Sequence, residues 1–342
     1  MNCSLTAKPS SLTANRRSQT GNHGAQRGVA AVTAILIVAI AAATATYLLA
    51  QQSATLNQAA LVSGRAQADA FSRAGIEWAR GILAEDARRT NIDSLGEPWA
   101  QPIAGLPVER AVVSGAITDA QGRLNLNNLV REGRRSDADV ATFRRLLEGL
   151  GLDAALADAV VDWVDADSDL AGPGGAEDAY YLALARPYRA ANQPMMQVEE
   201  LYRVRGFDRT AIARLAPHVS TLPGRALVNV NTASAEVLAA LLPDAMPGAI
   251  ARIVARRAEK PYASVDEMLA LAEGAKRDTA QSQAGVRSDH FLVAVRVEQD
   301  DVLVGSEALI RRGGGGGSAS TGAGAPAGNA NPVAIIWLRP LF

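Results

Sequence analysis

Six acidic residues between positions 162 and 178 form the part of this chain whose spacing most clearly suggests chemistry. Several alternate with other residues and the last two follow a glycine-rich turn, as oxygen ligands do in calcium-binding loops. Carboxylates this close together repel one another unless a cation neutralises them. The spacing therefore favours a structural Ca²⁺ site with five candidate ligands, namely Asp165, Asp167, Asp169, Glu177 and Asp178.

The same residues also fit a solvated acidic loop in which Asp162 and Asp165 end a helix and begin a turn. The EF-hand pattern is not matched, because Leu170 stands where that loop needs glycine and Ala176 where it needs glutamate. The residues alone leave both interpretations open. The three histidines are scattered and no nucleophile accompanies the acidic loop, so neither a catalytic metal centre nor an enzyme is expected.

The charge distribution argues against a nucleic-acid partner. The first fifty residues contain four basic and no acidic residues, and the remainder contains 30 basic and 35 acidic residues. A body with this mild negative charge has no large basic field to hold a phosphate backbone. The single cysteine, Cys3, excludes an intrachain disulfide, so packing and any bound metal must stabilise the body.

An uncharged segment of 22 residues, Val29–Ala50, predicts a membrane-spanning helix. At 1.5 Å per residue such a segment spans roughly 30 Å, which matches the hydrocarbon core of a bilayer. All charges before it are positive, so we expect a single pass with the N-terminus in the cytoplasm and the body outside. A secretory signal cut near Ala43–Ala45 is the alternative, although this apolar run is longer than such signals have.

The helix is expected to continue to about Arg89, because no proline occurs between Gln51 and Arg89. One apolar stripe follows at helical spacing, made of Phe71, Gly75, Trp78 and Ile82. We predict that Phe71 and Trp78 on this stripe contact a partner.

The junction Arg27-Gly28-Val29 resembles the cleavage site of type IV pilin-like proteins. The resemblance implies that a prepilin peptidase cuts between Gly28 and Val29, that the new N-terminus is methylated, and that the apolar helix remains as an anchor. Most such proteins carry a glutamate at the fifth mature position, where this chain has Thr33. An unpaired buried carboxylate is costly, so its loss suits a subunit with no neighbour above it. Thr33 is therefore a candidate interface residue.

Strand patterns precede and follow a long helical stretch in the body. Strands are predicted at 111–118, 124–127, 291–297, 302–310 and 333–338, and short helices from Ser136 to Glu273. The predicted fold is α+β, with a pilin-like long N-terminal helix packed on a small antiparallel sheet. A large all-helical insert, SAM-like or helix-hairpin-helix-like, interrupts that sheet.

These patterns divide the chain into five segments. They are a cytoplasmic leader at 1–28, the transmembrane half of the helix at 29–50, the pilin-like helix and first strands at 51–135, the helical insert at 136–273, and C-terminal strands at 274–342 with a glycine-rich connector at 313–332. Pilin-type subunits stack closely in a filament. A side domain of this size is therefore expected only in the topmost subunit.

Two motifs, Thr118–Leu129 and Trp163–Tyr181, resemble signatures of type II secretion system protein K, the minor pseudopilin K family. The resemblance runs from about Arg27 to the C-terminus. It implies an inner-membrane minor pseudopilin with a periplasmic body, which caps the pseudopilus tip for export of folded proteins across the outer membrane. The implied partners are minor pseudopilins I and J, other pseudopilins, the inner-membrane secretion platform and a prepilin peptidase. Calcium is known in that family, which supports the metal interpretation of the acidic loop.

A DNA-binding membrane receptor of DNA uptake is the rival interpretation. Val228–Ala233 followed by two short helices resembles a helix-hairpin-helix unit, and three arginines at 252, 256 and 257 follow it. However, Asp244 replaces the first glycine of the phosphate-binding hairpin, and prolines at 243 and 247 remove amide donors. A plain single-pass envelope protein with a helical stalk is the third possibility.

Overall fold

The computed structural model describes residues 23–313 and 333–341, and the chain divides into two compact units, Met1–Val62 and Ser63–Phe342. Most of the predicted leader and nearly all of the predicted connector lie outside the described residues. Helix α1, His23–Arg89, belongs to both units and ends at the predicted residue. It begins at His23 instead of Val29, because no proline separates these residues from the apolar segment.

The part of α1 in the first unit presents an apolar surface. Within Gly28–Arg89, an 18-residue stretch has a mean hydropathy of 2.4, and none of it is buried. The hydroxyls of Thr44 and Thr46 donate to carbonyls one turn earlier, so their polar groups are satisfied inside the helix. These properties fit a single-pass membrane anchor.

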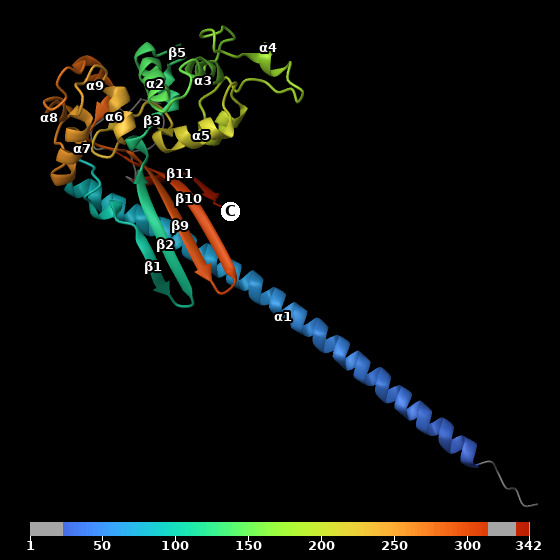
Figure 1. Cartoon of the computed structure of the whole chain (residues 1–342). Helices are drawn as coiled ribbons and strands as arrows, with labels where there is room; N and C mark the ends of the chain where they lie inside the picture. Colours follow the sequence, from blue (N-terminus) through green and yellow to red (C-terminus); the bar gives the residue numbers. More distant parts are fainter. Residues whose placement is uncertain (1–22, 314–332, 342) are drawn as a thin grey trace, which may run out of the picture. The chain divides into compact units, whose positions relative to one another are not determined.

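The second unit contains a five-stranded antiparallel sheet in the order β1-β2-β9-β10-β11. Figure 1 shows these strands side by side, with the C-terminal part of α1 behind them. Phe291, Val293, Val295 and Val297 are buried at alternate positions of β9 and share one core with α1, which confirms the predicted alternation. The strand bounds are Ile103–Val108 (β1), Ala111–Asp119 (β2), His290–Gln299 (β9), Val302–Arg312 (β10) and Val333–Pro340 (β11).

Strand β1 was not predicted. Pro102 and Pro107 flank and enter it, and Gly105 has a φ of +68°, so its sequence lacks a strand pattern. An edge strand tolerates these residues because one of its sides needs no hydrogen-bonding partner.

A helical module, Ala120–Gly285, lies between β2 and β9 around one large apolar core. Its helices are α2 (Asp137–Gly149), α3 (Leu156–Val164), α4 (Asp178–Tyr181), α5 (Arg209–Leu215), α6 (Ala235–Leu241), α7 (Ala249–Glu259), α8 (Val265–Leu269) and α9 (Arg277–Gln283). The 3₁₀ helices are η2 (Ala120–Gly122), η3 (Leu126–Leu129), η4 (Val198–Arg203) and η5 (Ala216–His218), and η1 (Pro98–Ala100) precedes the sheet. Short strand pairs are β3 (Leu124–Asn125) with β6 (Val219–Ser220), β4 (Val130–Arg131) with β5 (Arg134–Arg135), and β7 (Val228–Asn229) with β8 (Ala284–Gly285).

The module is longer at both ends than the predicted segment 136–273. The predicted strand 124–127 is only β3 followed by η3, and Leu124, Leu126 and Leu129 pack in the module core instead of the main sheet. Helix α9 was not predicted either, because its sequence is mostly polar and Ala280 is its only apolar residue. Tertiary packing, not local pattern, decides these boundaries.

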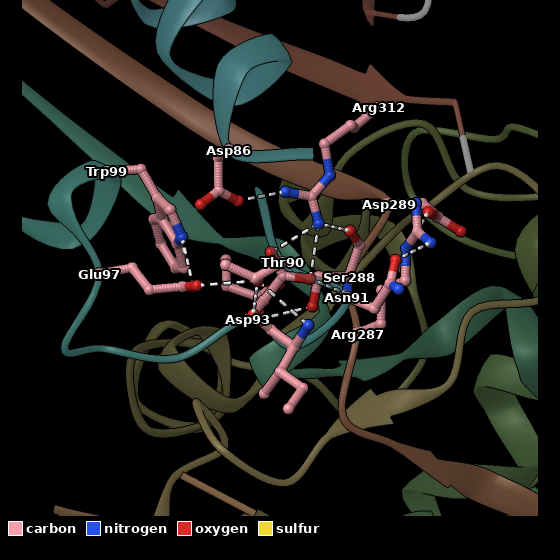
Figure 2. A network of polar contacts seen from close by, with 12 residues as sticks. Asp86, Thr90, Asn91, Asp93, Glu97, Trp99, Arg287, Ser288, Asp289 and Arg312 are labelled. Carbon is pink, nitrogen blue, oxygen red and sulfur yellow. Dashed lines mark hydrogen bonds and ion pairs between the residues drawn. The ribbon is translucent and has the colours of Figure 1, made fainter. Parts of the chain in front are cut away.

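A buried polar network, here called the junction network, joins the module to the sheet. Asp119 at the end of β2 accepts hydrogen bonds from Ser288 (2.6 Å) and Thr232 (2.6 Å), and the Ser288 N–H donates to Asp93 (2.7 Å). Figure 2 shows the Arg312 guanidinium among Asp93 and its neighbours. The module is thereby held at the end of the sheet where α1 finishes.

Candidate functional site

Three of the five predicted metal ligands come together in the structure. Asp165, Asp167 and Glu177 each offer a carboxylate oxygen within 4.8 Å of the others. Asp165 is the C-cap residue of α3 and Glu177 the N-cap residue of α4, so two helix ends hold the outer members of the group. We call these three residues the acidic cluster.

Asp169 and Asp178 do not join the acidic cluster. The Asp169 N–H donates to Asp167 Oδ1 at 2.9 Å, so Asp169 supports the loop through its backbone. Asp178 forms an ion pair with Arg189 (2.9 Å), which neutralises its charge, and also accepts a hydrogen bond from the Ala190 N–H (3.0 Å).

The acidic cluster has buried oxygens that nothing satisfies. Among the described residues, Asp165 Oδ1 and both carboxylate oxygens of Glu177 are buried without a hydrogen-bond partner. No basic side chain of residues 23–313 or 333–341 forms an ion pair with the cluster, whereas nearby Asp158 pairs with Arg144 at 2.5 Å. Buried carboxylates are rarely left this way, so the residues fit a bound cation.

The pKa values of two carboxyl groups in the acidic cluster are raised, as expected for buried carboxylates without a cation. Burial raises the pKa of Asp165 to about 7, and the charges of Asp167 and Asp162 contribute to the rise. Burial also raises the pKa of Glu177 to about 7, with neighbouring carboxylates as the second cause. An oxygen-only donor set of this kind suits Ca²⁺, which accepts flexible geometry.

Asp162, for which the sequence suggests only a role at a helix end or turn, lies beside the cluster. Its Oδ1 accepts a hydrogen bond from the Ala171 N–H at 2.7 Å, and its buried Oδ2 has no partner among the described residues. A Cβ at Gly175 would collide with this Oδ2, and one at Gly174 would collide with the carbonyl of Ala155. The glycine-rich turn is therefore packed directly against α3, and this contact shapes the site.

The predicted interface face of α1 borders an apolar groove of about 400 Å³. Phe71, Gly75 and Trp78 line it from α1, and residues of η1, β1, β2 and β9 line the opposite side. Trp78 is 53% exposed, whereas Ile76 on the neighbouring face of the helix is buried under the sheet. The groove offers an apolar surface that the described residues leave uncovered.

The predicted cleavage residues lie on the exposed N-terminal part of α1. A Cβ added at Gly28 would meet nothing within 4 Å, and Val29 is exposed. The Thr33 hydroxyl lies 3.0 Å from the carbonyl oxygen of Val29 and 2.9 Å from that of Ala30. Thr33 thus satisfies its polar group inside its own helix, which a glutamate at this position could not do.

The hairpin of the rival DNA interpretation uses its polar groups within the chain. The Met246 N–H donates to the carbonyl of Glu273 at 2.9 Å, and Asp244 pairs with Lys276 at 3.1 Å. Arg257 donates to the Val230 carbonyl at 2.7 Å. The Met246 amide and the Arg257 guanidinium, both possible phosphate donors, are thus already engaged within the chain.

A second acidic group, made of Asp86, Asp93 and Glu97, is satisfied by other side chains of the protein. Arg312 pairs with Asp86 at 2.6 Å and with Asp93 at 2.5 Å, and Glu97 accepts a hydrogen bond from the Trp99 indole at 2.8 Å. Figure 2 shows the guanidinium between the two aspartates. The group is structural, and sequence reasoning missed it because Asp93 and Arg312 are 219 positions apart.

A family model described as type II secretion system protein K matches residues 122–224, and a second model with the same description matches residues 228–287. Type II secretion system protein K of Pseudomonas aeruginosa is 34% identical over 287 residues, covering 81% of this chain and 86% of that protein. The protein of the same name from Klebsiella pneumoniae is 32% identical over 307 residues, covering 84% of this chain and 93% of its own length.

The structure is also similar to a solved chain from the crystal structure of the GspK-GspI-GspJ complex of the type 2 secretion system of enterotoxigenic Escherichia coli. The TM-score is 0.69 at 24% sequence identity, and the match covers 81% of this chain and 96% of that chain. This likeness supports the fold, including the long helix and the antiparallel sheet.

Proposed function

The chain belongs to the type II secretion system protein K family, and we propose that it caps the tip of the secretion pseudopilus as a minor pseudopilin. In this role it promotes assembly of the tip with minor pseudopilins I and J, so that folded proteins are exported across the outer membrane. The similar solved chain comes from a GspK-GspI-GspJ complex, which supports this choice of partners. The role is one of assembly and needs no catalytic residues.

The position of the helical module carries the tip assignment. The chain leaves the sheet after Asp119 of β2 and returns at His290 of β9, and Asp119 lies opposite Phe291 in the strand register. The module, which we interpret as SAM-like or helix-hairpin-helix-like, therefore occupies one end of the sheet. A subunit stacked on that end would meet the module, so neighbours are accommodated only on the other side.

The apolar part of α1 supports the anchoring role. We propose that a prepilin peptidase cuts between Gly28 and Val29 and that the new N-terminus is methylated. The helix then holds the protein in the inner membrane, with the body in the periplasm, until the tip forms. Thr33 removes the charge that would otherwise need a neighbour's terminal amine.

The groove beside α1 supports the proposed contact with I and J. An exposed tryptophan in an apolar groove is the type of residue that contributes most to interface affinity. Phe71 and Trp78 would receive the apolar face of a partner's helix there. The membrane half of α1 would contact other pseudopilins and the inner-membrane platform.

The acidic cluster supports a structural Ca²⁺ ion. Asp165, Asp167 and Glu177 would hold it, and the ion would supply the positive charge that the cluster lacks. The ion would stabilise the long loop between α3 and α4. Asp169 and Asp178 support that loop through the contacts described above.

Co-purification from membranes tests the tip assignment. The full chain is co-expressed with tagged minor pseudopilins I and J of its own secretion system, and its recovery with them is measured. Trp78→Ala is compared with Tyr202→Ala, because these aromatic residues are 53% and 54% exposed, respectively. We expect Trp78→Ala to reduce recovery at least about tenfold, as loss of a tryptophan hot spot does, and Tyr202→Ala to leave it unchanged. Failure of the unaltered chain to bind either pseudopilin would refute the proposal.

A further inference from the structure

Asn192 reaches the acidic cluster from a separate loop, between α4 and η4. Its Nδ2 donates to the backbone carbonyl of Asp167 at 3.2 Å, which fixes the amide beside a member of the cluster. Its Oδ1 is buried and has no hydrogen-bond partner among the described residues. An acceptor without a donor therefore belongs to a side chain that contacts Asp167, a member of the acidic cluster.

The backbone of Asn192 is held in an unusual conformation. Its φ is +46°, in the left-handed region that residues other than glycine seldom adopt and that asparagine tolerates best. Such conformations persist where the surroundings impose them, often at ligand-binding sites. The Nδ2 contact also sets the orientation of the amide, because only the nitrogen can donate to the Asp167 carbonyl.

The acidic cluster alone is short of ligands for the ion it suits. Calcium takes six to eight oxygens. Three carboxylates supply at most six, and Asp167 Oδ1 already accepts the Asp169 N–H. Calcium sites also use neutral amide oxygens as ligands, and such an oxygen adds no charge to the three carboxylates.

We propose that Asn192 Oδ1 is a ligand of the ion held by Asp165, Asp167 and Glu177. The inference rests on the proposed calcium site and assigns it a residue from outside the acidic loop. The ion then adds a second link at Asp167 between two segments that the Asn192–Asp167 hydrogen bond and the contacts of Asp178 with Arg189 and Ala190 already hold together. The second segment continues to Gln197, whose side chain accepts a hydrogen bond from Arg339 of β11 at 2.9 Å. Ion occupancy would thus stabilise the path from the acidic loop to the C-terminal strand.

Calorimetric titration of the full chain in detergent with CaCl₂ tests this assignment. Asn192→Ala removes the oxygen, Asn192→Gly removes it while keeping a residue that accepts positive φ, and Asn192→Asp keeps an oxygen. Gln193→Ala, at the next and exposed position, is the matched control. Melting in excess chelator checks that every variant is folded before titration.

We expect the alanine and glycine variants to raise the Kd for Ca²⁺ at least about tenfold, the range seen when residues supporting a metal are lost. The aspartate variant and the Gln193→Ala control should stay within about threefold of the unaltered chain or, for aspartate, bind more tightly. Equal affinity of Asn192→Ala and the unaltered chain would overturn the role of Asn192 and leave the calcium site standing. Absence of binding by the unaltered chain would overturn the calcium site itself and this inference with it.

Discussion

Arg312 and Asp93 form an ion pair with a closest N–O distance of 2.5 Å, and both side chains are 1% exposed. The same guanidinium binds Asp86 at the end of α1 and donates to the Ser288 carbonyl at 2.8 Å. One cation therefore joins the last turn of the long helix, the end of β10 and the segment that leaves the module. Rigid attachment of the module, on which the tip assignment depends, rests on this contact and on Asp119.

Replacement of Arg312 by leucine should destabilise the second unit strongly. The change leaves two buried aspartates without their cation, which costs about 3–5 kcal/mol in comparable buried pairs. Arg311→Leu is the control, because that neighbouring side chain is exposed, and it should change the free energy of unfolding by less than about 0.5 kcal/mol. Denaturant unfolding of both variants measures the difference. Similar unfolding free energies for the two variants would mean that the ion pairs of Arg312 with Asp86 and Asp93 contribute little to stability.

The glycine-rich turn gives a second prediction. Gly174→Ala forces a methyl group against the backbone carbonyl of Ala155, which cannot move without shifting α3. We expect a loss of about 1–3 kcal/mol in unfolding free energy, together with weaker Ca²⁺ binding, because the turn shapes the site. Gly149→Ala, at the last residue of α2 with nothing within 4 Å, should leave stability unchanged or slightly higher. Equal effects of the two alanines would contradict the packing described here.

The raised pKa values of Asp165 and Glu177 predict a pH dependence with a defined sign. Each pKa is about 7, above the ordinary value, so without metal the folded state holds protons that the unfolded state releases. In excess chelator, the contribution of this pair to stability should therefore fall as pH rises from about 5 to 8. Saturating Ca²⁺ should stabilise more at pH 8 than at pH 5.5, since the ion binds the ionised carboxylates.

The double variant Asp165→Asn, Glu177→Gln isolates this effect from other carboxyl groups whose pKa burial raises, such as Asp119 and Asp139. It should melt higher than the unaltered chain in chelator at pH 8 and show no stabilisation by Ca²⁺. Thermal melts at both pH values with and without the ion provide the comparison. A double variant that still gains stability from Ca²⁺ would place the ion elsewhere.

The elements that could be predicted are those with a long and regular pattern. The uninterrupted apolar segment and the absence of proline indicated α1, and alternation at Phe291, Val293 and Val295 indicated β9. Strand β1 could not be predicted, because it contains proline and glycine and is defined by its pairing with β2. Helix α9 could not be predicted, because its residues are mostly polar and it is packed through the buried Ala280. The sequence pattern reflects the local preference of a segment for helix or strand, whereas these two elements depend on contacts with residues far away in the sequence.

The candidate site also has a part that the sequence predicts and a part that depends on distant contacts. Sequence spacing indicated Asp165, Asp167 and Glu177, because alternating acids before a glycine-rich turn are a local signal. It could not show that Arg189 neutralises Asp178, nor that Asn192 approaches from another loop. Both facts depend on how the segment after α4 folds back, which no spacing rule encodes.

The mature N-terminus tests most directly whether the chain is a pilin-like subunit. The full chain is expressed with and without a prepilin peptidase, and the N-terminal residue of the membrane-bound product is read by mass spectrometry. We expect a methylated chain that begins at Val29 when the peptidase is present, and no cut for Gly28→Ala, whose added methyl group has free space in the helix. A chain that keeps its leader, or that is cut near Ala45 and released from the membrane, would contradict this expectation.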